Sequence, residues 1–176
     1  MTVFTIDVEG SVEKIVADFK ATPDKARLAA LRALNKTAFW LRTHAGSDIS
    51  KELRLPKKLV MERLKVIKAM RTKLQAVVTA KLYGVQANKV GTMRQNKTGS
   101  KVGSYEFPGA FIATMPKTGH TSIYKRKQQA RLPIQEMTIP LEPMASEIIE
   151  HYLDRQVMQR FEVVFRQELN FIMQQK

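Results

Sequence analysis

The chain has 176 residues, 44% of them hydrophobic, and a formal net charge of +14 from 30 Lys and Arg against 16 Asp and Glu. This length and apolar content suit one folded domain over residues 1–176. The absence of cysteine excludes disulfides, thiolate metal sites and cysteine nucleophiles. Neither a signal-peptide pattern nor a run of about 20 apolar residues occurs, so we expect a soluble protein without an export signal.

Residues 3–8 alternate weakly and fit a short strand or an extended arm within 1–10, and Ser11 opens a short helical pattern that ends near Lys20. Thr22, Pro23 and Asp24 then form a strong helix start, with Thr22 placed to cap free N–H groups. Apolar residues three or four apart continue this helix to about residue 46, where we expect it to stop.

A proline divides the next helical region. Residues 47–53 fit a separate helix, and the Leu55-Pro56 pair breaks it and starts a short helix over 56–64. Residues 74–82 then alternate between apolar and polar, which predicts a half-buried antiparallel strand, with 66–70 placed to pair with it.

The second half of the sequence predicts a β region followed by a helix. Residues 85–104 are rich in Gly and Asn and are expected to form a long basic loop or a hairpin extension. Strands follow at 102–107, 110–115, 121–126 and 134–139, with a turn at 116–119. Pro143 starts a final helix to Met173, long enough for part of it to pack on a neighbouring subunit. The fold class is α+β: N-terminal helices, a central antiparallel β-sheet with a long basic loop, and a long C-terminal helix.

Most of the positive charge lies in one part of the sequence. Ten Lys or Arg residues and no acid lie between Glu62 and Glu106. Charge runs are commonly solvated faces, but solubility alone does not require acids to be absent from so long a stretch. We therefore predict a surface that faces DNA or an acidic partner, formed by Lys57, Lys58, Arg63, Lys65, Lys68, Arg71, Lys89, Arg94, Lys97, Lys101, Lys125, Arg126 and Lys127.

The sequence contains no common catalytic or nucleotide-binding motif, and we expect no enzyme, no catalytic residues, no cofactor and no metal site. His44, His120 and His151 lack metal-ligand spacing. The acids of the last helix, Glu147, Glu150 and Asp154, fit a solvated helix face. Aromatic residues at helical spacing are expected in the core: Phe39, Trp40, Phe161, Phe165 and Phe171.

Several short segments, in order, resemble the minor tail protein Z family of phages. The first is Phe107-Pro108-Gly109-Ala110-Phe111-Ile112, which resembles the family's Pro-Gly-Ala-Phe core before a turn and a basic strand. Residues 57–65 look like its basic helix. Leu132-Pro133-Ile134 and residues 138–144, which contain Pro140, look like its segments before the C-terminal helix. The family's Arg-rich central loop corresponds here only to the milder stretch 89–101.

This resemblance, over about residues 24–169, implies a structural virion protein of a tailed phage or prophage and no catalysis. It implies a role in tail completion at the head-proximal end of the tail and in head–tail joining, as a ring commonly of six subunits. The implied partners are further copies of the chain, tail tube or terminator and head-connector proteins, and DNA passing through the lumen, with no membrane and no small-molecule substrate. The implied location is the virion tail, with assembly in the host cytoplasm.

The residues leave an alternative from another class. Phosphate contact needs only Lys and Arg, so the chain is also a candidate for a basic protein that binds DNA or RNA non-specifically. A nuclease is a more distant alternative, because it would need acids that converge near the basic segment. Salt-resistant rings would favour the tail component, whereas a monomer whose DNA binding falls steeply with salt would favour the nucleic-acid-binding protein.

Overall fold

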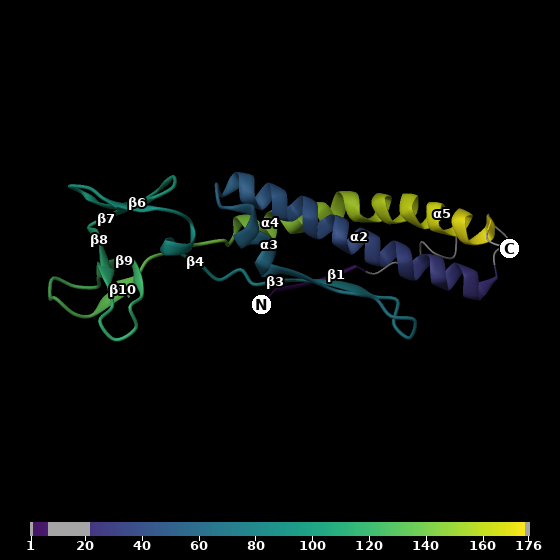
Figure 1. Ribbon diagram of the computed structural model, residues 1–176. Helices are drawn as coiled ribbons and strands as arrows, with labels where there is room; N and C mark the ends of the chain where they lie inside the picture. The colour runs from purple at the N-terminus through teal and green to yellow at the C-terminus, as the bar shows by residue number, and fades with distance from the viewer. Residues whose placement is uncertain (1, 7–21, 175–176) are drawn as a thin grey trace.

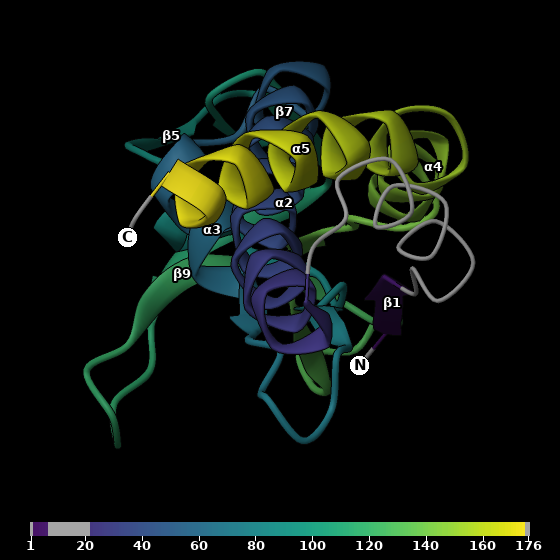
Figure 2. The ribbon, with the colours of Figure 1, turned by 90° about the vertical axis from the view of Figure 1, so that its right-hand side faces the viewer.

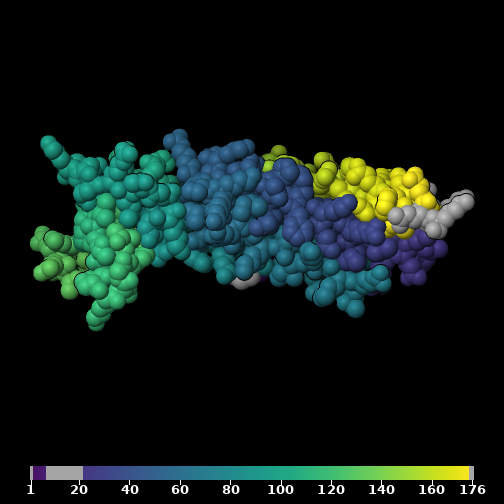
Figure 3. All heavy atoms as spheres, in the orientation of Figure 1, coloured from purple at the N-terminus to yellow at the C-terminus, as the bar shows by residue number. Residues whose placement is uncertain are grey.

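The computed structural model describes residues 2–6 and 22–174. Figures 1 and 3 show an elongated molecule with two parts. The helical body consists of β1 (Thr2–Ile6), α2 (Pro23–Glu52), α3 (Lys57–Arg63), β2 (Leu64–Ile67), β3 (Ala76–Ala80), α4 (Met144–Tyr152), η2 (Leu153–Val157) and α5 (Met158–Gln174). The β lobe contains β4 (Val85–Gln86), η1 (Ala87–Lys89), β5 (Met93–Gln95), β6 (Gly99–Val102), β7 (Tyr105–Pro108), β8 (Ala110–Thr114), β9 (Thr121–Arg126), β10 (Ile134–Glu136) and β11 (Thr138–Ile139). The short helix expected after Ser11 lies outside the described residues.

Helix α2 begins at Pro23, as predicted, but it continues without interruption to Glu52. The expected stop near residue 46 and the separate helix over 47–53 are therefore wrong. Gly46 is accommodated inside the helix because Met61 packs where its side chain would be. The expectation that Thr22 caps the helix through its side chain is also wrong, since only its backbone oxygen accepts a hydrogen bond, from the Ala26 N–H at 3.0 Å.

The helical body has three layers, with α2 in the middle. The C-terminal helix lies on one side of α2 and runs in the opposite direction, and the sheet of β1, β3 and β2 covers another side (Figures 1 and 2). Because α2 is covered on two sides, its buried positions extend beyond the predicted stripe and are mostly small, which lets the neighbouring backbones approach closely: Ala26, Ala29, Ala30 and Ala33.

The C-terminal helix runs from Met144 to Gln174 and contains one wide π-helical turn, η2. Its apolar stripe packs on α2 of the same chain, with Phe161 and Phe165 fully buried. The buried stripe of this helix is therefore covered within one chain, whereas Val163, Phe171 and Met173 remain exposed. Trp40 is partly buried against the core. Phe39 and Phe171 are exposed, so their expected core position is wrong.

The sheet of the helical body confirms the predicted antiparallel strand, although Thr79, expected on the outer side, is buried. Strand β3 lies in the centre and pairs antiparallel with β1 on one side and β2 on the other. Val66 faces Val78 in the register, which confirms the expected pairing of the two segments. Phe4 and Ile6 from β1 and Ala76 and Val78 from β3 are buried.

The β lobe differs from the single central sheet that was expected. Its strands form two three-stranded antiparallel sheets, of order β5-β6-β7 and β10-β9-β8, and a two-stranded ladder of β4 and β11. Residues 85–104 are not one long loop but contain β4, η1 and the whole β5–β6 hairpin, which agrees with the expected hairpin extension. The α+β fold class is confirmed, with its strands divided among four small sheets.

Two predicted strands are each divided in the structure. The segment 102–107 reverses direction at Gly103, whose φ of +56° is readily adopted by glycine, so β6 and β7 form a hairpin. The segment 134–139 changes partner, because β10 pairs with β9 and β11 pairs with β4. The turn at 116–119 and the strand 121–126 are confirmed.

Candidate partner-binding surfaces

The first group of predicted cations lies on α3 and β2. Lys57, Lys58 and Lys65 are exposed, as expected of contact residues. Arg63 differs from them. Its guanidinium donates to the Tyr83 carbonyl oxygen at 2.8 Å and lies 4.5 Å from the centre of the Tyr83 ring. Arg63 therefore joins α3 to the segment after β3, a structural role that the charge pattern did not predict.

Lys68 and Arg71 lie in the hairpin loop between β2 and β3. The Lys68 ammonium lies 5.6 Å from the centre of the Phe39 ring, which is 40% exposed on α2. The backbone oxygen of Arg71 accepts a hydrogen bond from Arg27 Nε at 2.9 Å. These contacts hold the hairpin loop beside α2, between Arg27 and Phe39.

The remaining predicted cations lie in the β lobe. Arg126 on β9 lies 5.8 Å from the centre of the Phe111 ring on β8. Lys101 is the one member of the predicted set that forms an ion pair within the described part of the chain, with Glu106 at 3.8 Å. The others are exposed on η1, on β5 and its turn, and on β9 and the loop that follows it: Lys89, Arg94, Lys97, Lys125 and Lys127.

The thirteen cations thus form two groups, one on the helical body and one on the β lobe. The β2–β3 hairpin and the β5, β6 and β9 strands lie toward opposite ends of the molecule (Figure 1). The predicted cations therefore do not form a single compact basic patch. The sequence could not predict this separation, because the distance between the two groups depends on how the β lobe is joined to the helices.

The family-like segment Pro108 to Phe111 turns the chain between the two sheets of the β lobe. Gly109 has a φ of +71°, and its N–H donates to the Thr98 carbonyl oxygen at 2.9 Å. Ala110 is buried at the start of β8. The bend that glycine was expected to permit is confirmed. Of the other family positions, Pro133 precedes β10 and Pro140 follows β11.

A partly buried carboxylate joins three segments of the β lobe. Glu136 on β10 accepts from Gln86 Nε2 at 3.1 Å and lies 2.8 Å from His120 Nε2. Burial alone would raise the pKa of Glu136, but these hydrogen bonds and the nearby imidazole outweigh it and hold the pKa below its ordinary value. Burial also raises the pKa of the neighbouring Tyr124 phenol, and the Glu136 charge adds to this effect.

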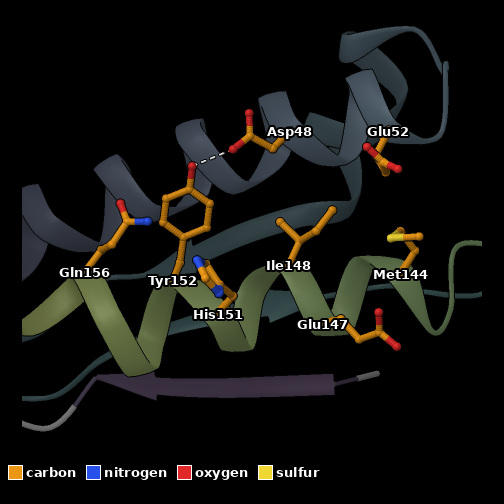
Figure 4. Close-up of a pocket in the computed structure, with 8 residues that line it drawn as sticks. All are labelled: Asp48, Glu52, Met144, Glu147, Ile148, His151, Tyr152 and Gln156. Carbon is orange, nitrogen blue, oxygen red and sulfur yellow. Dashed lines mark hydrogen bonds between the residues drawn. The ribbon is translucent and has the colours of Figure 1, made fainter.

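A groove with an acidic rim lies between the end of α2 and the first half of the C-terminal helix (Figure 4). It has a volume of about 370 Å³, and none of the described residues that line it is a Lys or Arg. We call it the acidic groove. The residues that line it are Asp48 and Glu52 of α2, Met144, Glu147, Ile148, His151 and Tyr152 of α4, and Gln156 of η2.

One hydrogen bond closes the inner side of the acidic groove. The Tyr152 hydroxyl donates to Asp48 Oδ2 at 2.6 Å, and burial together with this carboxylate raises the pKa of Tyr152 to about 12. Glu147 is exposed, as the sequence predicted for a solvated helix face. The sequence did not predict the groove, because its acids come from helices separated by about a hundred residues. The one sequence feature that pointed toward the groove was the spacing of Asp48 and Glu52, which lie four residues apart and therefore on one face of the helix.

Within residues 2–6 and 22–174, no three His, Asp or Glu side chains converge as metal ligands would. His44 Nδ1 lies 2.9 Å from the Trp40 carbonyl oxygen, while His120 pairs with Glu136. In the same residues, no helix has the length and apolar content that a bilayer crossing needs.

Comparisons with known proteins identify relatives of this chain. The family model of prophage minor tail protein Z matches residues 11–175. A protein of Escherichia phage N15 named "Tail completion protein" is 30% identical over 124 residues, which cover 64% of this chain and 67% of that protein. No solved structure matches the chain significantly. The chain belongs to the family of prophage minor tail protein Z.

Proposed function

We propose that this chain completes the phage tail at its head-proximal end and takes part in head–tail joining, as a ring of identical subunits such as a hexamer. It would act as a structural component of the virion tail after assembly in the host cytoplasm. Support comes from the family and from the relative in phage N15, whose name is that of a tail completion protein.

The predicted cations would face DNA in the lumen of this ring, or acidic surfaces of tail tube, terminator and head-connector proteins. The observation that carries this proposal is that the predicted cations form almost no ion pairs with carboxylates of the same chain, within the part of it that the structure describes. Apart from Lys101, no residue of the predicted set has a carboxylate partner within the described part of the chain. Cations that a fold leaves unpaired on its surface remain free to attract an anionic partner.

An assembly assay tests this function. A phage or prophage that lacks the chain would be complemented with the wild type or with the double variant Lys57→Glu, Lys58→Glu, and intact particles counted by plaque titre and electron microscopy. We expect the wild type to restore joined particles and the double variant to leave free heads and tails. Arg160, exposed on α5 outside the predicted set, provides the matched control Arg160→Glu. Full complementation by the double variant would count against a contact role for α3.

The ring is tested by native mass. Gel filtration with light scattering at low and high salt would give a discrete oligomer that survives high salt if the subunit contacts are mainly apolar. A monomer under every condition would contradict a ring that forms without the tail as template.

The alternative, non-specific binding of DNA or RNA, is favoured by one feature. Two cations stack on aromatic rings at the surface, Arg63 on Tyr83 and Arg126 on Phe111, and Tyr83 is 66% exposed. Such pairs suit both phosphate contact and base stacking. A DNA titration at several salt concentrations decides this point, since binding through phosphates weakens steeply with salt. Weak binding at low salt would exclude the alternative.

A further inference from the structure

We propose that the acidic groove of one subunit receives the basic β9–β10 loop, residues 127–133, of a second copy of the chain. This proposal rests on the self-association proposed above and names the two surfaces that make it. The loop and the groove are complementary in charge and in apolar character.

The acidic groove concentrates negative charge on a chain with a large positive excess. Within residues 2–6 and 22–174, three carboxylates and one imidazole line it, and no Lys or Arg does. Glu52 and Glu147 are exposed and form no ion pair with any described residue. Lys51 approaches Asp48 at 3.5 Å from outside the groove, with a side chain that is 77% exposed. The carboxylates at the rim are therefore open to cations from another molecule.

The floor of the groove is apolar. Ile148 and Met144 lie on the same side of α4 as Tyr152, and Figure 4 shows them along the helix below Asp48 and Glu52. A segment that fills this groove needs an apolar side chain for the floor and cations for the rim.

The β9–β10 loop has this composition. Lys127 and Arg131 are exposed, and Leu132, 68% exposed, is the most exposed of the large hydrophobic side chains in the described chain. One backbone hydrogen bond closes the loop, from the Lys127 N–H to the Pro133 carbonyl oxygen at 3.0 Å. An exposed leucine next to cations matches an apolar floor with an acidic rim.

The two surfaces lie apart within one subunit. The β9–β10 loop is at the outer end of the β lobe, whereas the acidic groove lies between α2 and α4 in the helical body (Figure 1). The loop therefore meets the groove of another copy. A contact between two different surfaces of identical subunits is heterologous, and its repetition produces a closed ring or an open helix.

Disulfide trapping tests the contact directly, because the chain has no cysteine of its own. Gln129→Cys in the loop and Gln156→Cys at the groove would be purified separately, mixed in equal amounts and oxidised with oxidised glutathione. We expect a mixed disulfide dimer on a non-reducing gel. Gln129→Cys mixed with Gln167→Cys, exposed on α5 away from the groove, is the matched control and should give at least tenfold less dimer.

Charge reversal tests the same contact without a crosslink. Glu52→Lys with Glu147→Lys, or Lys127→Glu with Arg131→Glu, should each weaken self-association about tenfold or more, since like charges then face each other. Mixing the two reversed proteins should restore association, because the charges are again complementary. Glu162→Lys on α5 and Lys117→Glu in the β8–β9 turn are exposed controls that should leave association unchanged.

Two outcomes would overturn the proposal. They distinguish a failure of the loop–groove contact from a failure of ring formation. An oligomer that forms equally well with the reversed charges, without the mixed disulfide, would retain the ring and reject this contact. A wild-type chain that stays monomeric at every concentration would reject both the contact and a ring formed by the chain alone. The role in tail completion would then still be tested by the complementation assay.

Discussion

The Tyr152 hydroxyl lies 2.6 Å from Asp48 Oδ2 and joins α4 to α2 across the inner side of the acidic groove. Burial and the Asp48 carboxylate both favour the protonated phenol, which is why the pKa of Tyr152 rises to about 12 from an ordinary value of 10.0. The same hydrogen bond positions one carboxylate of the groove and fixes the end of α4 against α2.

We expect Tyr152→Phe to lower the free energy of unfolding by about 1–3 kcal/mol, because a hydrogen bond to a partly buried carboxylate is lost. Urea unfolding monitored by circular dichroism at pH 7 measures this change. The stabilisation by Tyr152 is present below pH 10 and is lost as the pH rises through about 12. Tyr83→Phe is the control, since Tyr83 is 66% exposed, and a similar loss in that variant would contradict the assignment.

Glu136 gives the β lobe an acid-sensitive contact. Its pKa lies below the ordinary value of 4.5, so its stabilising effect is complete above that pH and is lost as the pH falls through the lowered value. At neutral pH we expect Glu136→Gln to be less stable than the wild type. The difference should shrink as the pH falls below 4.5, where the wild-type carboxyl also becomes neutral.

Thermal unfolding of the wild type and Glu136→Gln between pH 3 and 7 measures this effect. Glu142→Gln, an exposed change just before the C-terminal helix, is the control and should follow the wild type at every pH. A stability difference between wild type and Glu136→Gln that does not change with pH would show that the charge of Glu136 is not involved.

Gly99 is held closely against the neighbouring strand. A Cβ atom at this position would lie 2.2 Å from the Phe107 carbonyl oxygen and 2.9 Å from the Gly109 nitrogen. Because both are backbone atoms, they can move only if the β6–β7 pairing is disturbed. We expect Gly99→Ala to destabilise the protein by about 1–3 kcal/mol.

The matched control for Gly99 is Gly91→Ala, because nothing lies within 4 Å of a Cβ atom there. We expect that variant to stay within about 0.5 kcal/mol of the wild type in chemical unfolding. Equal stability of the two alanine variants would show that the β6–β7 hairpin tolerates the added methyl group.

Removal of the chain after Asp154 should make the protein insoluble. The truncation exposes the side of α2 that the C-terminal helix covers and removes six buried apolar residues: Val157, Phe161, Val164, Phe165, Leu169 and Ile172. The soluble fraction after centrifugation, with circular dichroism of any soluble material, measures the result. A soluble, folded truncation would show that the last helix is peripheral.

Two phenylalanines of α5 test the same packing with single substitutions. Phe165 is fully buried, and we expect Phe165→Ala to cost about 3–5 kcal/mol of stability. Phe171 is 52% exposed, and Phe171→Ala should change stability by less than about 1 kcal/mol. Similar losses from the two variants in urea unfolding would contradict the way α5 lies on α2.

The sequence by itself determined the features that depend on neighbouring residues. Pro23 starts α2, Pro56 separates it from α3, and the period of two around Val78 places β3 in a sheet. Short segments such as the one around Gly109 also indicated the family. The bend at Gly109 was predictable because a positive φ is a local property that glycine adopts readily.

The tertiary structure alone decided where surface groups meet. Met61 packs where a Cβ of Gly46 would lie, Arg63 becomes structural because Tyr83 is folded beside it, and Phe39 stays exposed on α2. The separation of the cations and the acidic groove between Asp48 and Tyr152 depend in the same way on contacts between distant segments. Such contacts are absent from the local pattern, since side chains far apart in the chain become neighbours only when the helices and sheets pack.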